Sequence, residues 1–248
     1  MSRRVLPSVI LAALAGLPWS GWAALCPGVS ERLAPLPGVQ AVLEAGQPLT
    51  IVALGSSSTE GAGASSPLAS YPNRLDAALR SMLPGVELRV VNAGKSGETS
   101  EAMLARLEAD VLAHKPELVI WQAGGNEVLL GHDPGTFLTL MRQGLRRLRQ
   151  SGIEVVLMDN QRAPRILEAP THAPFDAAMQ ALAREERVPL FARSRLMRGW
   201  QEAGLAPNDM LAPDGLHHND RGYACLAEAL AAALIGSAGQ RDRLLARH

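Results

Sequence analysis

The stretch LTIVALGSSSTEG, residues 49–61, decides the fold class of this 248-residue chain. Its first six residues are mostly apolar, which is typical of a β-strand that is buried on both faces. The run stops at Gly55, and the serines at 56–58 follow where a helix would begin. A strand of this kind belongs to a parallel sheet that is covered by helices on both sides.

The rest of the chain continues this alternation. Further strands are predicted at residues 87–91, 118–121, 153–158 and 188–192, and helices at 72–83, 101–112, 137–151, 175–186 and 223–234. Such βαβ units predict one α/β domain over residues 49–248, a three-layer α/β/α sandwich with a five-stranded parallel sheet. Pro189 predicts that the last strand lies at an edge, because proline cannot donate to a strand ladder. Residues 24–48 are expected to form a lead-in segment around one short helix.

The N-terminus has the order of a secretory signal peptide. Arg3 and Arg4 precede an apolar run over residues 5–17, and Gly21 and Ala23 are small residues suited to cleavage after Ala23. The run is shorter than the roughly 20 apolar residues that span a membrane. We therefore expect a signal peptide at residues 1–23 and an exported protein, periplasmic or secreted, without a stable membrane anchor after cleavage. An uncleaved anchor is the alternative.

Charge and cysteine content narrow the function classes. The 24 basic and 24 acidic residues balance, so the chain lacks the basic excess that nucleic-acid binding requires, and no nucleic-acid partner is expected. Cys26 and Cys225 are the only cysteines. In an oxidising compartment they could form one disulfide between the N-terminal segment and the last helix, with two separate buried thiols as the alternative.

Three loops that follow the first three predicted strands carry groups suited to acyl transfer. The carboxyl ends of parallel strands meet at one edge of a sheet, where ligands bind. The serines at 56–58 offer an exposed nucleophile, the second loop offers the backbone N–H of Gly97, and the third offers the side-chain amide of Asn126. Each loop taken singly also suits an ordinary turn or, for the serines, a helix cap or phosphate-binding loop.

A fourth segment precedes the last predicted helix. Asp214 and His217 are three residues apart, a spacing at which the carboxylate can orient the imidazole and stabilise its charged form. His218 is offset by one residue and is expected to point away or to contact substrate. No cluster of cysteines and carboxylates indicates a metal site, and no cofactor is expected.

The order of these four segments resembles the SGNH, or GDSL-type, serine hydrolase family over about residues 50–235. The likeness is greatest to the branch of bacterial periplasmic thioesterases and small carbohydrate esterases. It implies a flavodoxin-like (SGNH hydrolase) topology, with Ser57 as nucleophile and Asp214 and His217 as its base system. It also implies an oxyanion hole made by the backbone N–H groups of Ser57 and Gly97 and the amide of Asn126.

Two departures from the family pattern leave alternatives open. The Gly-Asp-Ser of the family is Gly-Ser-Ser at residues 55–57, so Ser56 and Ser58 are alternatives to Ser57 as the nucleophile. Gly94 is likewise an alternative to Gly97 in the second loop. Asp159, Asn160 and Gln161 follow the fourth strand at the same edge and are expected to line the substrate pocket.

The resemblance implies a hydrolase that cleaves carboxylic esters or thioesters through an acyl-enzyme. The expected partner is a small-molecule or glycan ester with a short acyl group or an O-acetylated sugar, because no long apolar lid is evident. The alternatives are a catalytically weak glycan-binding module of the same fold, a flavodoxin-type phosphate binder, and a metal-dependent phosphoester hydrolase. The sequence does not indicate the oligomeric state.

Overall fold

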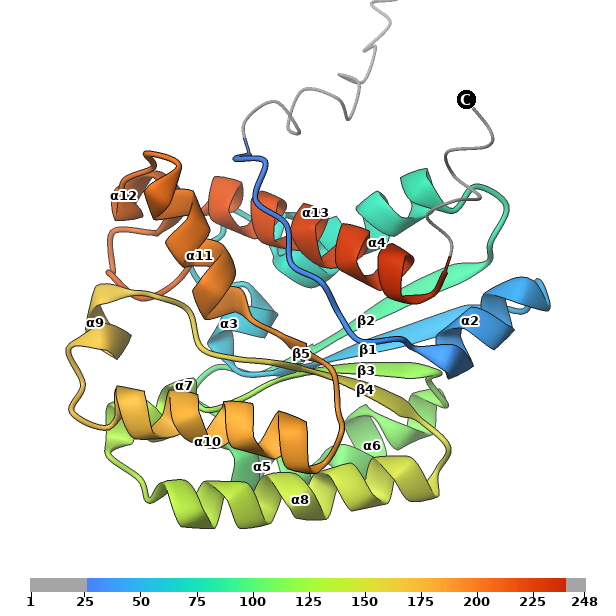
Figure 1. The fold of residues 1–248 in the computed structure, drawn as a ribbon, viewed down its shortest axis with the longest axis horizontal. Coiled ribbons are helices and arrows are strands. Elements are labelled where there is room, and N and C mark those ends of the chain that lie inside the picture. The colour runs from blue at the N-terminus through green and yellow to red at the C-terminus, as the bar shows by residue number, and fades with distance from the viewer. Residues whose placement is uncertain (1–25, 240–248) are drawn as a thin grey trace, which may run out of the picture.

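The computed structural model describes residues 26–239 (Figure 1). Five parallel strands form one sheet in the order β2-β1-β3-β4-β5, which confirms the predicted α/β class. The strands are β1 (Leu49–Gly55), β2 (Leu88–Gly94), β3 (Leu118–Gln122), β4 (Glu154–Met158) and β5 (Leu190–Phe191). As Pro189 predicts, β5 lies at an edge of the sheet.

Helices cover both faces of the sheet (Figure 1). One face carries α4 (Tyr71–Met82) and α13 (Asp220–Ser237), which pack on each other, and α2 (Pro37–Glu44) of the lead-in segment. The other face carries α5 (Ser100–Ala105), α6 (Leu107–Asp110), α8 (Pro134–Gln150) and α10 (His172–Glu185). The remaining helical segments are α3 (Ser57–Glu60), η1 (Pro67–Ala69), η2 (Leu112–His114), α7 (Gly125–Leu130), α9 (Pro164–Leu167), α11 (Arg193–Glu202) and α12 (Pro207–Met210).

The ends of β1 and β2 are aligned, which brings their loops together. Gly55 pairs with Gly94, so β2 runs three residues beyond the predicted end at residue 91. A Cβ atom at Gly94 would lie 2.1 Å from the backbone nitrogen of Glu60. Only glycine therefore lets α3 turn back so closely over the end of β2.

The helices differ from those predicted in two main respects. The helix predicted over residues 101–112 is broken into α5, α6 and η2, with Arg106 at the first break. The helix α11 was not predicted, because its short, arginine-rich sequence carries few apolar residues. Leu196, Met197 and Trp200 form its buried side.

A disulfide between Cys26 and Cys225 joins the start of the described chain to α13, as the cysteine count allowed. The lead-in segment is held at further points. Glu31 is buried and forms an ion pair with Arg195 of α11, and the N–H of Leu36 donates to the carbonyl of Ser237. The N-terminal segment is therefore fixed along the outside of α11 and α13.

The predicted signal peptide, residues 1–23, lies outside the described part of the chain. Within residues 26–239, none of the helices has both the length and the apolar character needed to cross a bilayer.

Candidate active site

The structure brings Ser57, His217 and Asp214 into one hydrogen-bonded line. His217 Nε2 lies 2.7 Å from Ser57 Oγ, and His217 Nδ1 lies 2.5 Å from Asp214 Oδ2. Ser57 is the first residue of α3, directly after β1, whereas His217 and Asp214 stand in the loop before α13. A hydroxyl, an imidazole and a carboxylate at these distances form the arrangement that activates a serine as a nucleophile.

The neighbouring serines are both buried. Ser56 is buried, and both its N–H and its hydroxyl donate to Oε1 of Gln122 at 3.0 Å. Ser58 is also buried, at 3% exposure. Ser57 is only partly buried and is the serine of the three that meets His217. Of the three candidates, the geometry therefore favours Ser57.

Asp214 is placed to remain charged and to orient the imidazole. Its Oδ1 accepts the backbone N–H groups of Leu216 and His217, both at 2.9 Å. Partial burial raises the pKa of Asp214, but the hydrogen bonds from the His217 ring and from these two N–H groups outweigh it and hold the pKa below its ordinary value. With Nδ1 donating to this carboxylate, Nε2 is left to accept a proton from Ser57.

Two buried side chains, those of Gln161 and Arg193, hold the loop that carries Asp214 and His217. Nε2 of Gln161 donates to the carbonyl of Leu216 at 3.1 Å, and Nη2 of Arg193 donates to Oε1 of Gln161 at 2.7 Å. Arg193 is fully buried and also donates to the carbonyl of Asp159 at 3.0 Å. Arg193 was not among the predicted site residues, since nothing in a charge-rich segment distinguishes a buried arginine from a solvated one.

The three predicted oxyanion donors come from the loops predicted after β1, β2 and β3, of which the first and third begin short helices: Ser57 is the first residue of α3, and Asn126 is the second residue of α7. The N–H groups of Ser57 and Gly97 have no protein acceptor within the described part of the chain. Asn126 donates through Nδ2 to the carbonyl of Glu98 at 2.7 Å. Because a primary amide has two N–H bonds, this contact leaves one of them for a ligand.

Gly97 and Gly94, the two candidates for the oxyanion donor of the second loop, differ in backbone conformation and in whether the N–H is already hydrogen-bonded. Gly94 uses its N–H for Oδ1 of Asn92 and belongs to β2, where its role is close packing against α3. Gly97 is exposed and has a φ of +78°, a conformation that favours glycine. The geometry therefore favours Gly97 as the donor.

His218 points away from the site, which is one of the two outcomes expected for it. Its ring is buried between Trp200 and Tyr223, with ring centroids 6.0 and 5.4 Å away, and its Nδ1 lies 3.1 Å from the carbonyl of Met210. Burial, aided by the charge of Arg193, lowers the pKa of His218 to about 3. His218 is therefore a neutral core residue near neutral pH.

The cavity beside Ser57 is small, with room of about 10 Å³. Its lining includes Asn126 and Gln161, and Leu129, Ile166 and Leu216 supply apolar surface. Gln161 thus lines the pocket as expected, whereas Asn160 is not among the lining residues and lies against Gly124 and Gly125, and Asp159 lines a different cavity. A wide, open groove of about 540 Å³ begins at Leu129 and runs between residues 128–131 and 165–171.

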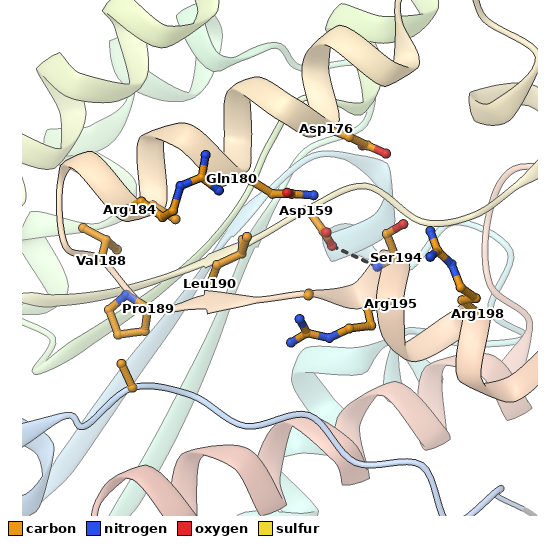
Figure 2. A pocket seen from close by; sticks show the side chains of 13 residues that line it. Asp159, Asp176, Gln180, Arg184, Val188, Pro189, Leu190, Ser194, Arg195 and Arg198 are labelled. Atoms are coloured by element: carbon orange, nitrogen blue, oxygen red, sulfur yellow. Dashed lines mark hydrogen bonds between the residues drawn. The ribbon is translucent and has the colours of Figure 1, made fainter.

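A second large cavity, of about 470 Å³, lies beside β5 and away from the triad (Figure 2). Figure 2 shows side chains of α10 on one wall and of α11 on the other, with Asp159 between them. Oδ1 of Asp159 accepts the N–H of Ser194 at 3.0 Å. Ser194 has no histidine beside it among the lining residues, and Arg195 is already paired with Glu31. This cavity therefore offers no nucleophile and base pair, and no group of three metal-binding side chains occurs within residues 26–239.

Asp159 and His218 are expected to give the stability of the protein two opposite pH dependences. Burial raises the pKa of Asp159 to about 7. Because the unfolded carboxyl titrates near 4, this group makes the protein less stable as pH rises from about 4 to about 7. The depressed pKa of His218 acts in the other direction, so that this group adds stability as pH rises from about 3 to about 6.5. Each slope approaches about 1.4 kcal/mol per pH unit.

The measurement is the free energy of unfolding of Asp159→Asn and His218→Gln between pH 4 and 7, each taken as a difference from the wild type. Asparagine can still accept the N–H of Ser194, so the substitution removes mainly the charge. The free energy of unfolding of Asp159→Asn minus that of the wild type should rise with pH. The corresponding difference for His218→Gln should fall with pH. Curves parallel to that of the wild type would contradict the prediction.

Comparison with known proteins matches nearly the whole chain to one family. The family model described as the non-GDSL lipase-like family matches residues 24–240. Thioesterase 1/protease 1/lysophospholipase L1 of Escherichia coli K12 is 34% identical over 145 residues, which cover 58% of this chain and 66% of that protein. The chain thus spans just under two thirds of the length of this relative.

Two further relatives are covered over more of their length. The arylesterase of Vibrio mimicus is 27% identical over 166 residues, which cover 67% of this chain and 78% of that protein. The crystal structure of TesA is 27% identical and superposes with a TM-score of 0.65, over 76% of this chain and 99% of that one.

Proposed function

The chain belongs to the non-GDSL lipase-like family of SGNH hydrolases, and from this membership we propose that it is a serine hydrolase that cleaves carboxylic esters and thioesters. The observation that carries the proposal is the 2.7 Å contact between His217 Nε2 and Ser57 Oγ, with Asp214 behind the ring. The similarity to a thioesterase and to an arylesterase supports the same class of reaction.

The proposed reaction proceeds through an acyl-enzyme. His217 Nε2 takes the proton of Ser57 as Oγ forms a bond to the carbonyl carbon of the ester. The negative charge that develops on the carbonyl oxygen is stabilised by the N–H groups of Ser57 and Gly97 and by the free N–H of Asn126. The bond to the leaving oxygen or sulfur then breaks as His217 returns the proton to it. Water repeats the sequence and releases the acid.

The substrate class is proposed from the shape of the site. A cavity of about 10 Å³ beside Ser57, lined in part by Leu129, Ile166 and Leu216, has room for about one water-sized group, such as the methyl group of an acetyl ester. The open groove that starts at Leu129 leaves the remaining part of the substrate in solvent. Short-acyl esters, including O-acetylated carbohydrates, fit this arrangement.

Export is proposed as well. The predicted signal peptide at residues 1–23 supports it, and so does the Cys26–Cys225 disulfide, because disulfides persist mainly in oxidising compartments.

The test is a series of p-nitrophenyl esters from acetate to decanoate. We expect kcat/KM to be highest for the shortest acyl chains, because a long chain must leave the small cavity. Ile166→Ala removes one wall and should move the optimum toward longer chains, whereas Leu68→Ala, on an exposed side chain outside the cavity lining, should leave the profile unchanged. A well-folded protein that turned over no ester or thioester would contradict the proposal and favour a glycan-binding module.

A further inference from the structure

Arg106, at the junction of α5 and α6, donates hydrogen bonds to four different residues. Its side chain is only 10% exposed. Nη2 donates to the carbonyl of Ala93 at 2.8 Å and to that of Gly55 at 3.2 Å. Nε donates to Glu98 at 2.6 Å, and Nη1 donates to Asp110 at 3.0 Å. One guanidinium group thus joins the ends of β1 and β2 to the loop that follows β2.

These contacts connect all three loops that carry oxyanion donors. Gly55 is two residues before Ser57, and Glu98 directly follows Gly97. The carbonyl of Glu98 in turn accepts the amide of Asn126 at 2.7 Å. Arg106 therefore contacts the first and second loops directly and reaches the third loop through Glu98.

Ion pairing alone does not account for this arrangement. Asp110 has a second cationic partner, because Nζ of Lys95 lies 2.7 Å from the same oxygen, Oδ2. What Arg106 adds is the pair of bonds to backbone carbonyls at the strand ends. A planar group with five N–H donors can make such bonds together with the bond to Glu98, whereas the compact ammonium of lysine is a single point of contact.

We propose that Arg106 is a positioning residue that sets the spacing of the oxyanion donors at Ser57, Gly97 and Asn126. The inference rests on the proposed function, since it concerns the transition state of ester cleavage. Donors must lie about 2.7–3.1 Å from the oxygen on which the negative charge develops, so a small displacement weakens their effect. A shift of these loops should therefore weaken binding of the transition state more than binding of the substrate.

The experiment compares Arg106→Gln with Arg147→Gln on the best p-nitrophenyl ester. Arg147 is a matched control, because it also contacts a backbone carbonyl and a glutamate, those of Leu104 and Glu108, away from the three loops. The measurements are kcat, KM, the Ki of an alkyl trifluoromethyl ketone, and the fraction of active sites titrated with a fluorophosphonate.

For Arg106→Gln we expect kcat per titrated site to fall about 10- to 100-fold, less than or similar to the loss of one oxyanion donor. KM should change little, and the Ki of the ketone should rise by the same factor as kcat/KM falls, because the ketone adduct resembles the transition state. Arg106→Lys should not restore activity. Arg147→Gln should match the wild type in every measurement.

Glu98→Gln provides a second test that spares the buried arginine and covers the case in which Arg106→Gln does not fold. It should show a smaller loss of kcat, with a Ki that again rises by the factor by which kcat/KM falls. Wild-type kcat in either folded variant, or a loss of kcat without a change in Ki, would overturn the inference. Failure of the proposed function is a separate result, because the wild-type enzyme would then not hydrolyse the ester at all.

Discussion

Replacing Ser57 with alanine should lower kcat for ester hydrolysis by about a million-fold, the loss seen when a triad nucleophile is removed. His217 would then have no hydroxyl to deprotonate, and no acyl-enzyme could form. The oxyanion donors would remain, so a small residual rate above that of water is expected. The measurement is steady-state hydrolysis of a short p-nitrophenyl ester, together with covalent labelling by a fluorophosphonate, which should disappear.

The adjacent serines are the matched controls for this prediction. Ser58→Ala should keep its label and its activity. Ser56→Ala loses the hydroxyl bond to Gln122 and should be less stable by about 1 kcal/mol, yet it should still react. If the label persisted in Ser57→Ala and vanished in one of the controls, the assignment of the nucleophile would be wrong.

Removing the disulfide should have the largest effect on stability. The double variant Cys26→Ser/Cys225→Ser is expected to lose about 5 kcal/mol of unfolding free energy by a chain-entropy estimate, because the bridge closes a very long loop. The two residues are 199 positions apart. Without the bridge, the unfolded chain gains conformational entropy, because the two cysteines can move apart. The folded state gains no comparable entropy.

Urea unfolding of the wild type, with and without dithiothreitol, and of the double variant provides the measurement. The reduced wild type and the double variant should unfold at the same, lower urea concentration. The folded double variant should retain its esterase activity, because the bridge contributes no group to the triad. An unfolding curve that did not respond to reductant would contradict the prediction.

The sequence was sufficient to predict the sheet and the residues that now lie together at its edge. Buried strands have a distinct apolar pattern, and parallel strands present their following loops at one edge. The pairing of Ser57 with His217, 160 residues away, was expected from the resemblance to the family, because the topology brings the loops together without selecting one of the three serines. The spacing of Asp214 and His217 is local and could be read directly.

What the sequence could not show is which charged residues turn inward. Arg106 and Arg193 both stand in segments whose composition is typical of solvated helix surfaces, yet the first is largely buried and the second fully so. Their partners are mostly backbone carbonyls and residues of other loops, and such contacts exist only once the loops have met. The break of the predicted helix at residues 101–112 falls at Arg106 and was missed for the same reason.

The position of the two cysteines also constrains the order of folding. All five strands lie between Cys26 and Cys225, and the described residues contain no free cysteine. With two cysteines in the chain, no incorrect pairing can arise within one molecule. In a chain that is synthesised N-terminus first, Cys26 has no partner until Cys225, 199 residues later, has followed. The disulfide therefore forms late, after all five strands have been synthesised, and does not guide the early assembly of the sheet.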